Sequence, residues 1–150
     1  MLIGIPPLLT PELLKILMEM GHDDALVLAD ANFTAMRLAA GKPVVRLPGI
    51  GLRDAVEAVA TVLPLATDVP HPVAYMQIDP AAPQRRSALQ RSVCDFLQAK
   101  MLPSQSAESV ERYAFYERTR AAYAIVQTGE RQPFGNVILR KGVIGDTLEP

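Results

Sequence analysis

The sequence is poor in cysteine and in aromatic residues: it has one cysteine, no tryptophan, four tyrosines and four phenylalanines among its 150 residues. The single Cys94 cannot form a disulfide within the chain, and no Cys/His spacing typical of a zinc site surrounds it. We interpret it as a small packing residue. Such cysteine usage fits a reducing compartment, so we expect a cytoplasmic protein.

The chain also lacks a long hydrophobic segment and an excess of charge of either sign. Residues 1–9 are apolar, but they are too few to span a bilayer, contain two prolines and lack the basic leader of a signal peptide. Fifteen Lys and Arg nearly cancel sixteen Asp and Glu, which leaves a net charge of −1. We therefore expect neither a nucleic acid nor a membrane as partner.

The common nucleotide-binding and catalytic motifs are absent as well. The chain contains neither Gly-x-Gly-x-x-Gly nor Gly-x-x-x-x-Gly-Lys-Ser/Thr, and neither Gly-x-Ser-x-Gly nor His-Glu-x-x-His. No motif therefore supports a dinucleotide enzyme, a nucleotide-binding protein, a serine hydrolase or a zinc peptidase. The candidate chemistry lies in polar residues at the ends of helices and strands.

The composition and the alternation of elements indicate an α/β protein. With 49% hydrophobic and 21% charged residues, the 150-residue chain suits one domain over residues 1–150. Apolar periodicity predicts helices over 11–21, 52–63 and 83–97 and in the stretch that ends near Ala122, and strands over 25–29, 44–47, 73–78, 123–128 and 135–139. This alternation predicts a single three-layer doubly wound domain with a mostly parallel sheet of about five or six strands and helices on both faces.

Two polar residues flank the first predicted strand. The helix before it begins with Thr10 as N-cap and Pro11 at the first helical position, and Gly21 ends it just before His22. Asp30 follows the apolar run Ala25–Ala29 directly. It stands at the carboxyl end of that strand, where ligands tend to bind in open α/β sheets. The sequence alone does not give the distance between His22 and Asp30.

Five blocks of the sequence resemble, in the same order, the ribose pyranase and L-fucose mutarotase family. They are PLLTPELLKILMEMGHDD (7–24), ADANF (29–33), RYAFYER (112–118), TGER (128–131) and FGNVILRKGV (134–143). The Phe-Tyr-Glu-Arg segment of the third block inclines the resemblance toward the L-fucose mutarotase branch. The resemblance covers nearly the whole chain, with gaps in register around 38–48 and 80–106.

The resemblance implies a cofactor-free enzyme that interconverts the α and β anomers of a free sugar. It also implies sites at subunit contacts in a ring-shaped oligomer, typically of ten subunits. By position, His22 matches the proton donor of the family. Asp30 and Arg112 match substrate contacts, and Phe134, Gly135 and Asn136 match the tripeptide that closes the sugar site.

Two positions depart from the family pattern. Phe134 stands where the family usually has tyrosine, so one phenolic hydroxyl is missing and the sugar preference stays open. Thr34 replaces a frequent proline, and we expect this change to affect only the loop.

Each candidate residue also has a structural interpretation. A histidine after a helix-ending glycine can interact with the terminal carbonyls, and Asp30 can cap a helix. Arg112 can pair with Glu108, and Asn136 can be a turn residue before a strand. The resemblance favours the functional interpretation for His22, whereas for Arg112 the two interpretations stay even.

The residue types suit anomer exchange, which opens the pyranose ring to the aldehyde and closes it again. One group must take the proton of the anomeric hydroxyl while another gives a proton to the ring oxygen. An imidazole, with an unperturbed pKa near 6.5, offers both protonation states near neutral pH, so we assign proton transfer to His22. Asp30, Arg112 and Asn136 supply acceptors and donors that can orient sugar hydroxyls.

Two other functions fit the same residues. A ribose pyranase would recognise a different pattern of hydroxyls with the same frame. A non-catalytic sugar-binding accessory protein of a transport system would use the same pocket without turnover, and the missing phenol at Phe134 is the feature that motivates this alternative.

Overall fold

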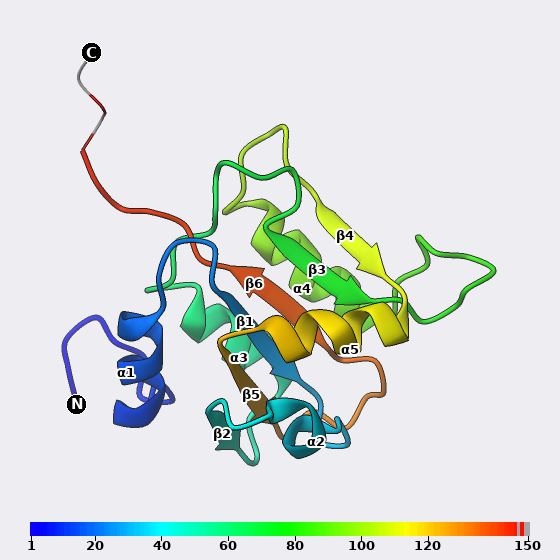
Figure 1. Cartoon of the computed structure of the whole chain (residues 1–150), viewed down its shortest axis with the longest axis horizontal. Helices are drawn as coiled ribbons and strands as arrows, with labels where there is room; N and C mark the ends of the chain where they lie inside the picture. The colour runs from blue at the N-terminus through cyan, green and yellow to red at the C-terminus, as the bar shows by residue number, and fades with distance from the viewer. Residues whose placement is uncertain (147, 149–150) are drawn as a thin grey trace.

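A six-stranded sheet organises the computed structural model, which describes residues 1–146 and 148 (Figure 1). Of the acidic tail 146–150, residues 147, 149 and 150 lie outside the described residues. The strand order is β2-β5-β1-β6-β3-β4. The strands are β1 (Ala25–Ala29), β2 (Val44–Leu47), β3 (Val73–Met76), β4 (Ala107–Val110), β5 (Ala124–Thr128) and β6 (Val137–Arg140).

The sheet is mostly parallel, as the alternation of helices and strands predicts, but β6 runs antiparallel between β1 and β3. Its register sets Val137 opposite Leu28 and Leu139 opposite Leu26. The segment 129–136 that joins β5 to β6 is shorter than the dozen or more residues that a parallel crossover needs, so the chain can only return in the opposite direction. The start of β6 therefore lies beside the carboxyl end of β1.

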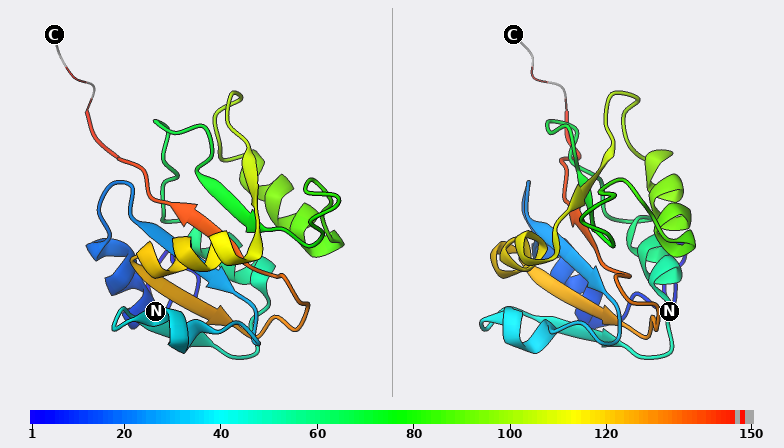
Figure 2. Two further views of the ribbon diagram at one scale, coloured as in Figure 1. Left: turned by 45° about the vertical axis from the view of Figure 1, so that its right-hand side comes forward. Right: turned by 90° about the vertical axis from the view of Figure 1, so that its right-hand side faces the viewer.

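In the described part of the chain, five helices cover both faces of the sheet, as expected for three layers (Figure 2). Residues of α1, α3 and α4 share one buried cluster with the sheet, and residues of α2 and α5 share the other. The helices are α1 (Pro11–Glu19), α2 (Ala35–Ala39), α3 (Leu52–Val59), α4 (Ala88–Gln98) and α5 (Arg112–Ala121).

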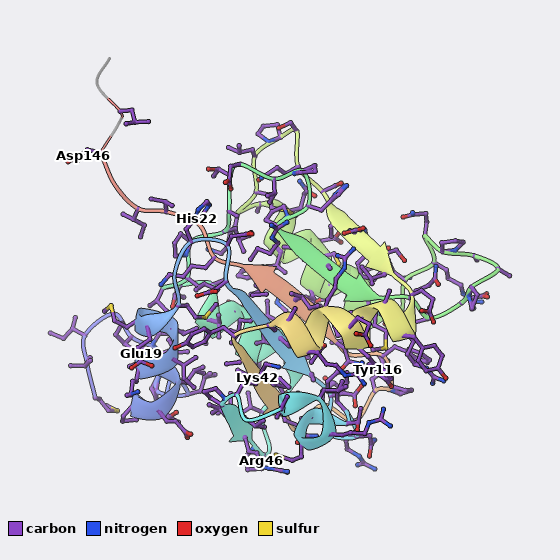
Figure 3. All side chains as sticks on the ribbon, in the orientation of Figure 1. Glu19, His22, Lys42, Arg46, Tyr116 and Asp146 are labelled. Atoms are coloured by element: carbon purple, nitrogen blue, oxygen red, sulfur yellow. The ribbon has the colours of Figure 1, made fainter. Side chains whose placement is uncertain are left out.

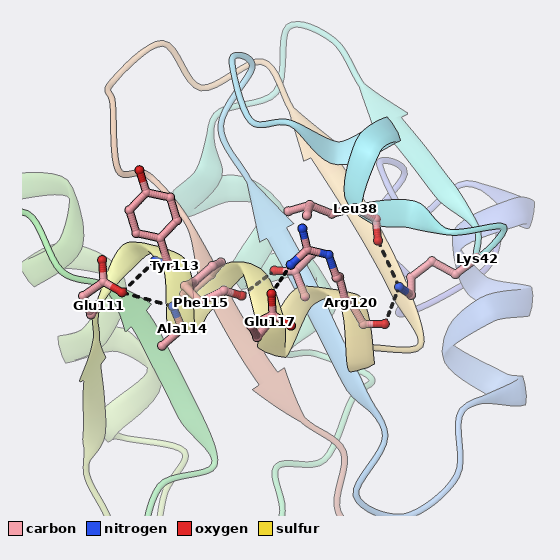
Figure 4. A network of polar contacts seen from close by, with 9 residues as sticks. Leu38, Lys42, Glu111, Tyr113, Ala114, Phe115, Glu117 and Arg120 are labelled. Carbon is pink, nitrogen blue, oxygen red and sulfur yellow. Dashed lines mark hydrogen bonds and ion pairs between the residues drawn. The ribbon is translucent and has the colours of Figure 1, made fainter.

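Caps fix where the site-bearing helices begin. Thr10 accepts a hydrogen bond from the backbone N–H of Leu13 (3.2 Å), as its predicted role as N-cap of α1 requires. The Glu111 carboxylate accepts hydrogen bonds from the first backbone N–H groups of α5 (2.8 and 3.1 Å; Figure 4). Lys42 ties the end of α2 to the end of α5 by donating to the carbonyls of Leu38 and Arg120. Arg112 thus stands at the fixed first turn of α5.

The sequence does not predict α2 and β4, and several helices begin or end at other residues than expected. α2 has only five residues, and β4 is a four-residue edge strand with the polar sequence Ala-Glu-Ser-Val, so neither gives a clear apolar period. The helix expected from Pro83 begins at Ala88, because Ser87 and Gln90 form a capping box there. The helices expected to reach Gly21 and Leu63 end at Glu19 and Val59.

In the described part of the chain, no helix is long and apolar enough to cross a membrane.

The aromatic packing of α5 predicts a large loss of stability on truncation. Phe115 is fully buried and meets Phe33, in the loop after β1, edge to face at 6.2 Å. Phe115→Ala should lower the free energy of unfolding by about 3–5 kcal/mol in urea titrations. Met36→Ala, at a side chain that is 64% exposed on α2, should change it by less than about 0.5 kcal/mol. Equal losses for the two variants would contradict this packing.

Candidate functional site

Asp30 occupies the carboxyl end of β1, and its carboxylate is buried with only 5% of the residue exposed. One carboxylate oxygen accepts a hydrogen bond from the backbone N–H of Asn32 (2.9 Å). Asp30 therefore closes a local turn and does not cap a helix. This turn directs the loop after β1 back across the edge of the sheet.

Asn136 holds the same aspartate from the start of β6. Its amide nitrogen donates to the second carboxylate oxygen of Asp30 (3.0 Å), and its amide oxygen accepts from the backbone N–H of Asp30 (2.9 Å). Asn136 is 2% exposed, so this two-way pair is shielded from water. The structure thus brings together two residues that are 106 positions apart in the sequence.

Burial raises the pKa of the Asp30 carboxyl above its ordinary value of 3.8, although the hydrogen bonds from Asn32 and Asn136 oppose the rise. A carboxylate with a raised pKa is a stronger proton acceptor than an exposed one. Each of its oxygens accepts one hydrogen bond, which leaves lone pairs for a further donor.

Phe134 and Gly135 lead into Asn136 in a tightly held segment. Phe134 has a φ of 62°, a conformation that costs energy for a bulky side chain. A Cβ at Gly135 would come within 3.0–3.2 Å of Glu130, Gln132 and Leu89, so this position has little room for a side chain.

Gln90 of α4 is hydrogen-bonded to the backbone of this segment. Its buried amide donates to the carbonyls of Phe134 (3.0 Å) and Met76 (2.7 Å). The amide therefore fixes the backbone of the tripeptide against the sheet.

Arg112 lies at the same edge of the sheet, after β4. Its side chain is exposed, and its guanidinium lies 5.2 Å from the centre of the Tyr113 ring. The alternative pairing with Glu108 is wrong, because Glu108 forms a two-bond ion pair with Arg118 (2.8 and 3.0 Å). The cation of Arg112 is thus left facing solvent at the carboxyl edge, about three strand spacings or roughly 14 Å from β1.

His22 lies at the opposite end of β1, in the loop that precedes the strand (Figure 3). Its structural interpretation as a partner of the last carbonyls of α1 is wrong, since the ammonium of Lys141 donates to the carbonyls of Leu17 and Met20 instead. The imidazole Nε2 lies 3.0 Å from a carboxylate oxygen of Asp68. About half of each side chain is exposed, so the ring is open to a ligand.

A cleft of about 470 Å³ lies next to the His22 loop. It is lined by small apolar side chains and by the residues of two ion pairs, Asp23–Arg140 and Glu108–Arg118. This volume is within the range of small-molecule sites. The cleft contains none of the six residues that the sequence nominates.

The structure therefore divides the nominated residues into two groups. Asp30, Phe134, Gly135 and Asn136 form one connected cluster, with Arg112 on the same edge. His22 stands apart, because the five residues of β1 at ~3.3 Å each separate the two ends by roughly 16 Å.

The sequence did not point to two residues that hold the candidate site: Asp68, which contacts His22, and Gln127, which holds the loop after Asp30. Asp68 carries a detectable signal, because it lies in a loop before a predicted parallel strand, and such loops meet at one edge of the sheet. Gln127 donates to the carbonyls of Ala31 and Phe33 and so fixes the loop after Asp30. No sequence pattern marks an isolated glutamine in a buried strand as a residue that holds a neighbouring loop.

No group of three or more His, Cys, Asp or Glu side chains within residues 1–146 and 148 is arranged to hold a metal ion. The fold and the cluster define an α/β protein with a buried carboxylate–amide pair, Asp30 and Asn136, at the carboxyl edge of its sheet.

The chain belongs to the RbsD / FucU transport protein family, whose model matches residues 3–144. Human fucose mutarotase is 42% identical over an alignment that covers 94% of this chain and 93% of that protein. The structure of the fucose mutarotase from Streptococcus pneumoniae in complex with L-fucose has a TM-score of 0.86 and 32% identity, and the match covers 96% of this chain and 100% of that one. The structure of Bacillus subtilis RbsD complexed with D-ribose has a TM-score of 0.69 and 26% identity over 91% and 95% of the two chains.

The raised pKa of Asp30 predicts a pH dependence of stability. A carboxyl whose pKa is higher in the folded state contributes stability that is present below pH 3.8 and is lost as the pH rises through its folded pKa. Asp30→Asn does not titrate, so the stability of the wild type relative to this variant should fall as the pH rises from 4 toward 7. Urea titrations at fixed protein concentration across this range measure the difference. A difference that does not change with pH would contradict a raised pKa.

Proposed function

We propose that this protein is an isomerase that interconverts the α and β anomers of free L-fucose. The observation that carries the proposal is the full-length similarity to proteins named fucose mutarotase, together with a fold that matches a fucose mutarotase bound to L-fucose. The likeness to the D-ribose complex is weaker in both fold and sequence, so we place L-fucose before D-ribose.

The reaction needs one proton given and one proton taken. The imidazolium of His22 gives a proton to the ring oxygen while the bond between this oxygen and the anomeric carbon breaks. The anomeric hydroxyl loses its proton, and its oxygen becomes the carbonyl oxygen of the open aldehyde. After rotation about the bond between the first two carbons, the same transfers run in reverse and close the ring on the other face.

Asp30 is the acceptor that the predicted site offers for the proton of the anomeric hydroxyl. Burial raises the pKa of its carboxyl and makes its carboxylate a stronger proton acceptor. Asn136 presents a donor and an acceptor next to it, and Arg112 presents several donors in a planar fork. The ring of Phe134 offers an apolar face without the phenolic hydroxyl that the family usually carries here.

A site shared between subunits follows from this assignment. What supports sharing is the separation of His22 from Asp30 and Asn136 along β1, which exceeds the width of a monosaccharide. A neighbouring subunit that turns its carboxyl edge toward the His22 loop completes the set. Repetition of this heterologous contact closes a ring, and we propose the ten-subunit assembly that the resemblance implies.

We place the protein in the cytoplasm. Its single Cys94 is buried, and burial raises the pKa of this thiol to about 11, so the thiol is protonated at neutral pH and poorly reactive. Such a cysteine suits packing in a reducing compartment.

The two histidines of the chain provide a matched test of proton transfer. His22→Gln should lower the rate of L-fucose anomer exchange by about 10²–10⁴-fold, because it removes the acid and base. His71→Gln, at a loop histidine that contacts the Ser106 carbonyl, should keep nearly the full rate. Saturation-transfer NMR of the two anomeric protons measures both.

Three results of this experiment count against the proposal. A wild type that exchanges L-fucose no faster than buffer rejects the enzyme, and binding without exchange selects the accessory protein. Faster exchange of D-ribose than of L-fucose selects the pyranase.

Mixed oligomers test whether the site is shared. His22→Gln and Asp30→Asn subunits, each inactive alone, should regain activity when they are unfolded together and reassembled. With equal amounts and random mixing, about one site in four combines an intact His22 with an intact Asp30, so about a quarter of the wild-type rate should return. If both residues act from one chain, the mixture will remain as inactive as its parts.

A further inference from the structure

The pairing of β3 with β6 stops at the candidate site. Beyond the last paired residues, Tyr75 and Val137, one more backbone bond runs from the N–H of Met76 to the carbonyl of Asn136 (3.1 Å). Phe134 has a φ of 62°, so the chain there leaves the extended conformation and cannot continue the pairing. The carbonyls of Met76 and Phe134 therefore need a donor from elsewhere, because a carbonyl that is shielded from water and unpaired costs free energy.

One side chain, Gln90 of α4, supplies the donors for both carbonyls. Its amide nitrogen lies 2.7 Å from the carbonyl oxygen of Met76 and 3.0 Å from that of Phe134. Its amide oxygen accepts from the backbone N–H of Ser87 (3.2 Å), as part of the capping box of α4. Gln90 is 1% exposed, and both hydrogens of its amide are used. The side chain thus forms a bridge between the end of β3, the segment before β6 and the first turn of α4.

Other contacts between α4 and this segment are weaker. The Ser87 hydroxyl donates to the side-chain oxygen of Gln132 (3.3 Å) in an exposed hydrogen bond, and the N–H of Gly135 donates to the carbonyl of Gln132 (3.3 Å). Leu89 lies within 3.2 Å of where a Cβ at Gly135 would stand, so the helix packs closely against the backbone here. The Gln90 bridge is the buried polar contact among them, and burial strengthens a hydrogen bond.

The bridged segment carries two groups that the proposed function places on the sugar. A positive φ at a bulky residue persists only where the surroundings hold it, and the hydrogen bond to the Phe134 carbonyl is such a restraint. Asn136 follows two residues later, and its amide meets the Asp30 carboxylate. Without the bridge, Phe134 can relax to a negative φ and move Asn136 with it.

Building on the proposed mutarotase function, we propose that Gln90 is a positioning residue that sets the affinity for the sugar by holding Phe134 and Asn136. Gln90 lies in the stretch 80–106, where the resemblance has a gap in register, so the resemblance assigns it no role. The proton-transfer groups do not depend on the bridge, because Asn32 also holds Asp30 and His22 lies at the other end of β1. The bridge therefore acts on KM more than on kcat.

The first experiment removes the donors but keeps the shape of the side chain. Gln90→Glu retains the acceptor for Ser87 and replaces the donating nitrogen with oxygen. Near pH 8 it should raise KM for L-fucose exchange by about tenfold or more and change kcat by less than about threefold. Gln98→Glu, on the same helix, is the matched control. It removes a donation to the carbonyl of Gln105 (2.9 Å), far along α4 from the site, and should keep both constants.

The pH profile separates positioning from a general loss of structure. Burial and two facing carbonyls favour the neutral form of a carboxyl at position 90, so its pKa should lie above the ordinary glutamate value of about 4.3. Once protonated, this carboxyl can donate to one carbonyl. The KM of Gln90→Glu relative to the wild type should therefore fall as the pH is lowered from 8 to 6. Gln90→Met has no donor and buries no charge, so it should show a raised KM at every pH and also serves if the charged variant does not assemble.

Hydrogen exchange tests the bridge without turnover. The backbone N–H groups of Met76 and Gly135 are hydrogen-bonded, so peptides that contain them should exchange slowly in the wild type. Gln90→Met should speed exchange in both peptides by about tenfold, as measured by mass spectrometry, and should leave the peptide of α1 unchanged. This readout does not depend on the identity of the sugar.

Three outcomes overturn the role of Gln90. They are a Gln90→Met variant with the wild-type KM, an equal rise of KM in Gln98→Glu, and wild-type exchange rates in both peptides of Gln90→Met. Faster hydrogen exchange in Gln90→Met, together with a wild type that does not turn over L-fucose, supports the bridge and rejects the proposed function.

Discussion

The position of one buried strand determines how this protein can work. β1 is paired on both sides, with β5 and β6, and every residue from Leu26 to Ala29 is fully buried. Its ends therefore cannot approach each other, and the imidazole before the strand stays separate from the carboxylate after it. The proposal that both groups act on one small sugar therefore places one of them on a second copy of the chain.

The fold was largely predictable because its strongest signals are local. A continuous apolar run identifies β1, and the cap at Thr10 identifies the start of α1. α2 has too few residues to show a helical period, and the polar sequence of β4 hides its strand character. The direction of β6 follows from the segment before it, which is too short for a parallel crossover. This constraint is present in the sequence, but the alternation of helices and strands favours a parallel strand instead.

The candidate site was predictable in its residue types but not in its geometry. Resemblance pointed to His22, Asp30 and Asn136, yet only the structure reveals that the last two form a reciprocal pair while the first contacts Asp68. Such contacts join residues that are distant in sequence, and a single sequence contains no record of them. Burial also raises the pKa of the Asp30 carboxyl, and the identity of the residue alone does not indicate this shift.

The most direct test of a two-chain site is a crystal structure of the assembled protein with L-fucose. The account predicts one sugar per subunit, placed between the imidazole of His22 from one subunit and the Asp30–Asn136 pair of its neighbour. A sugar whose protein contacts all come from a single chain would contradict it.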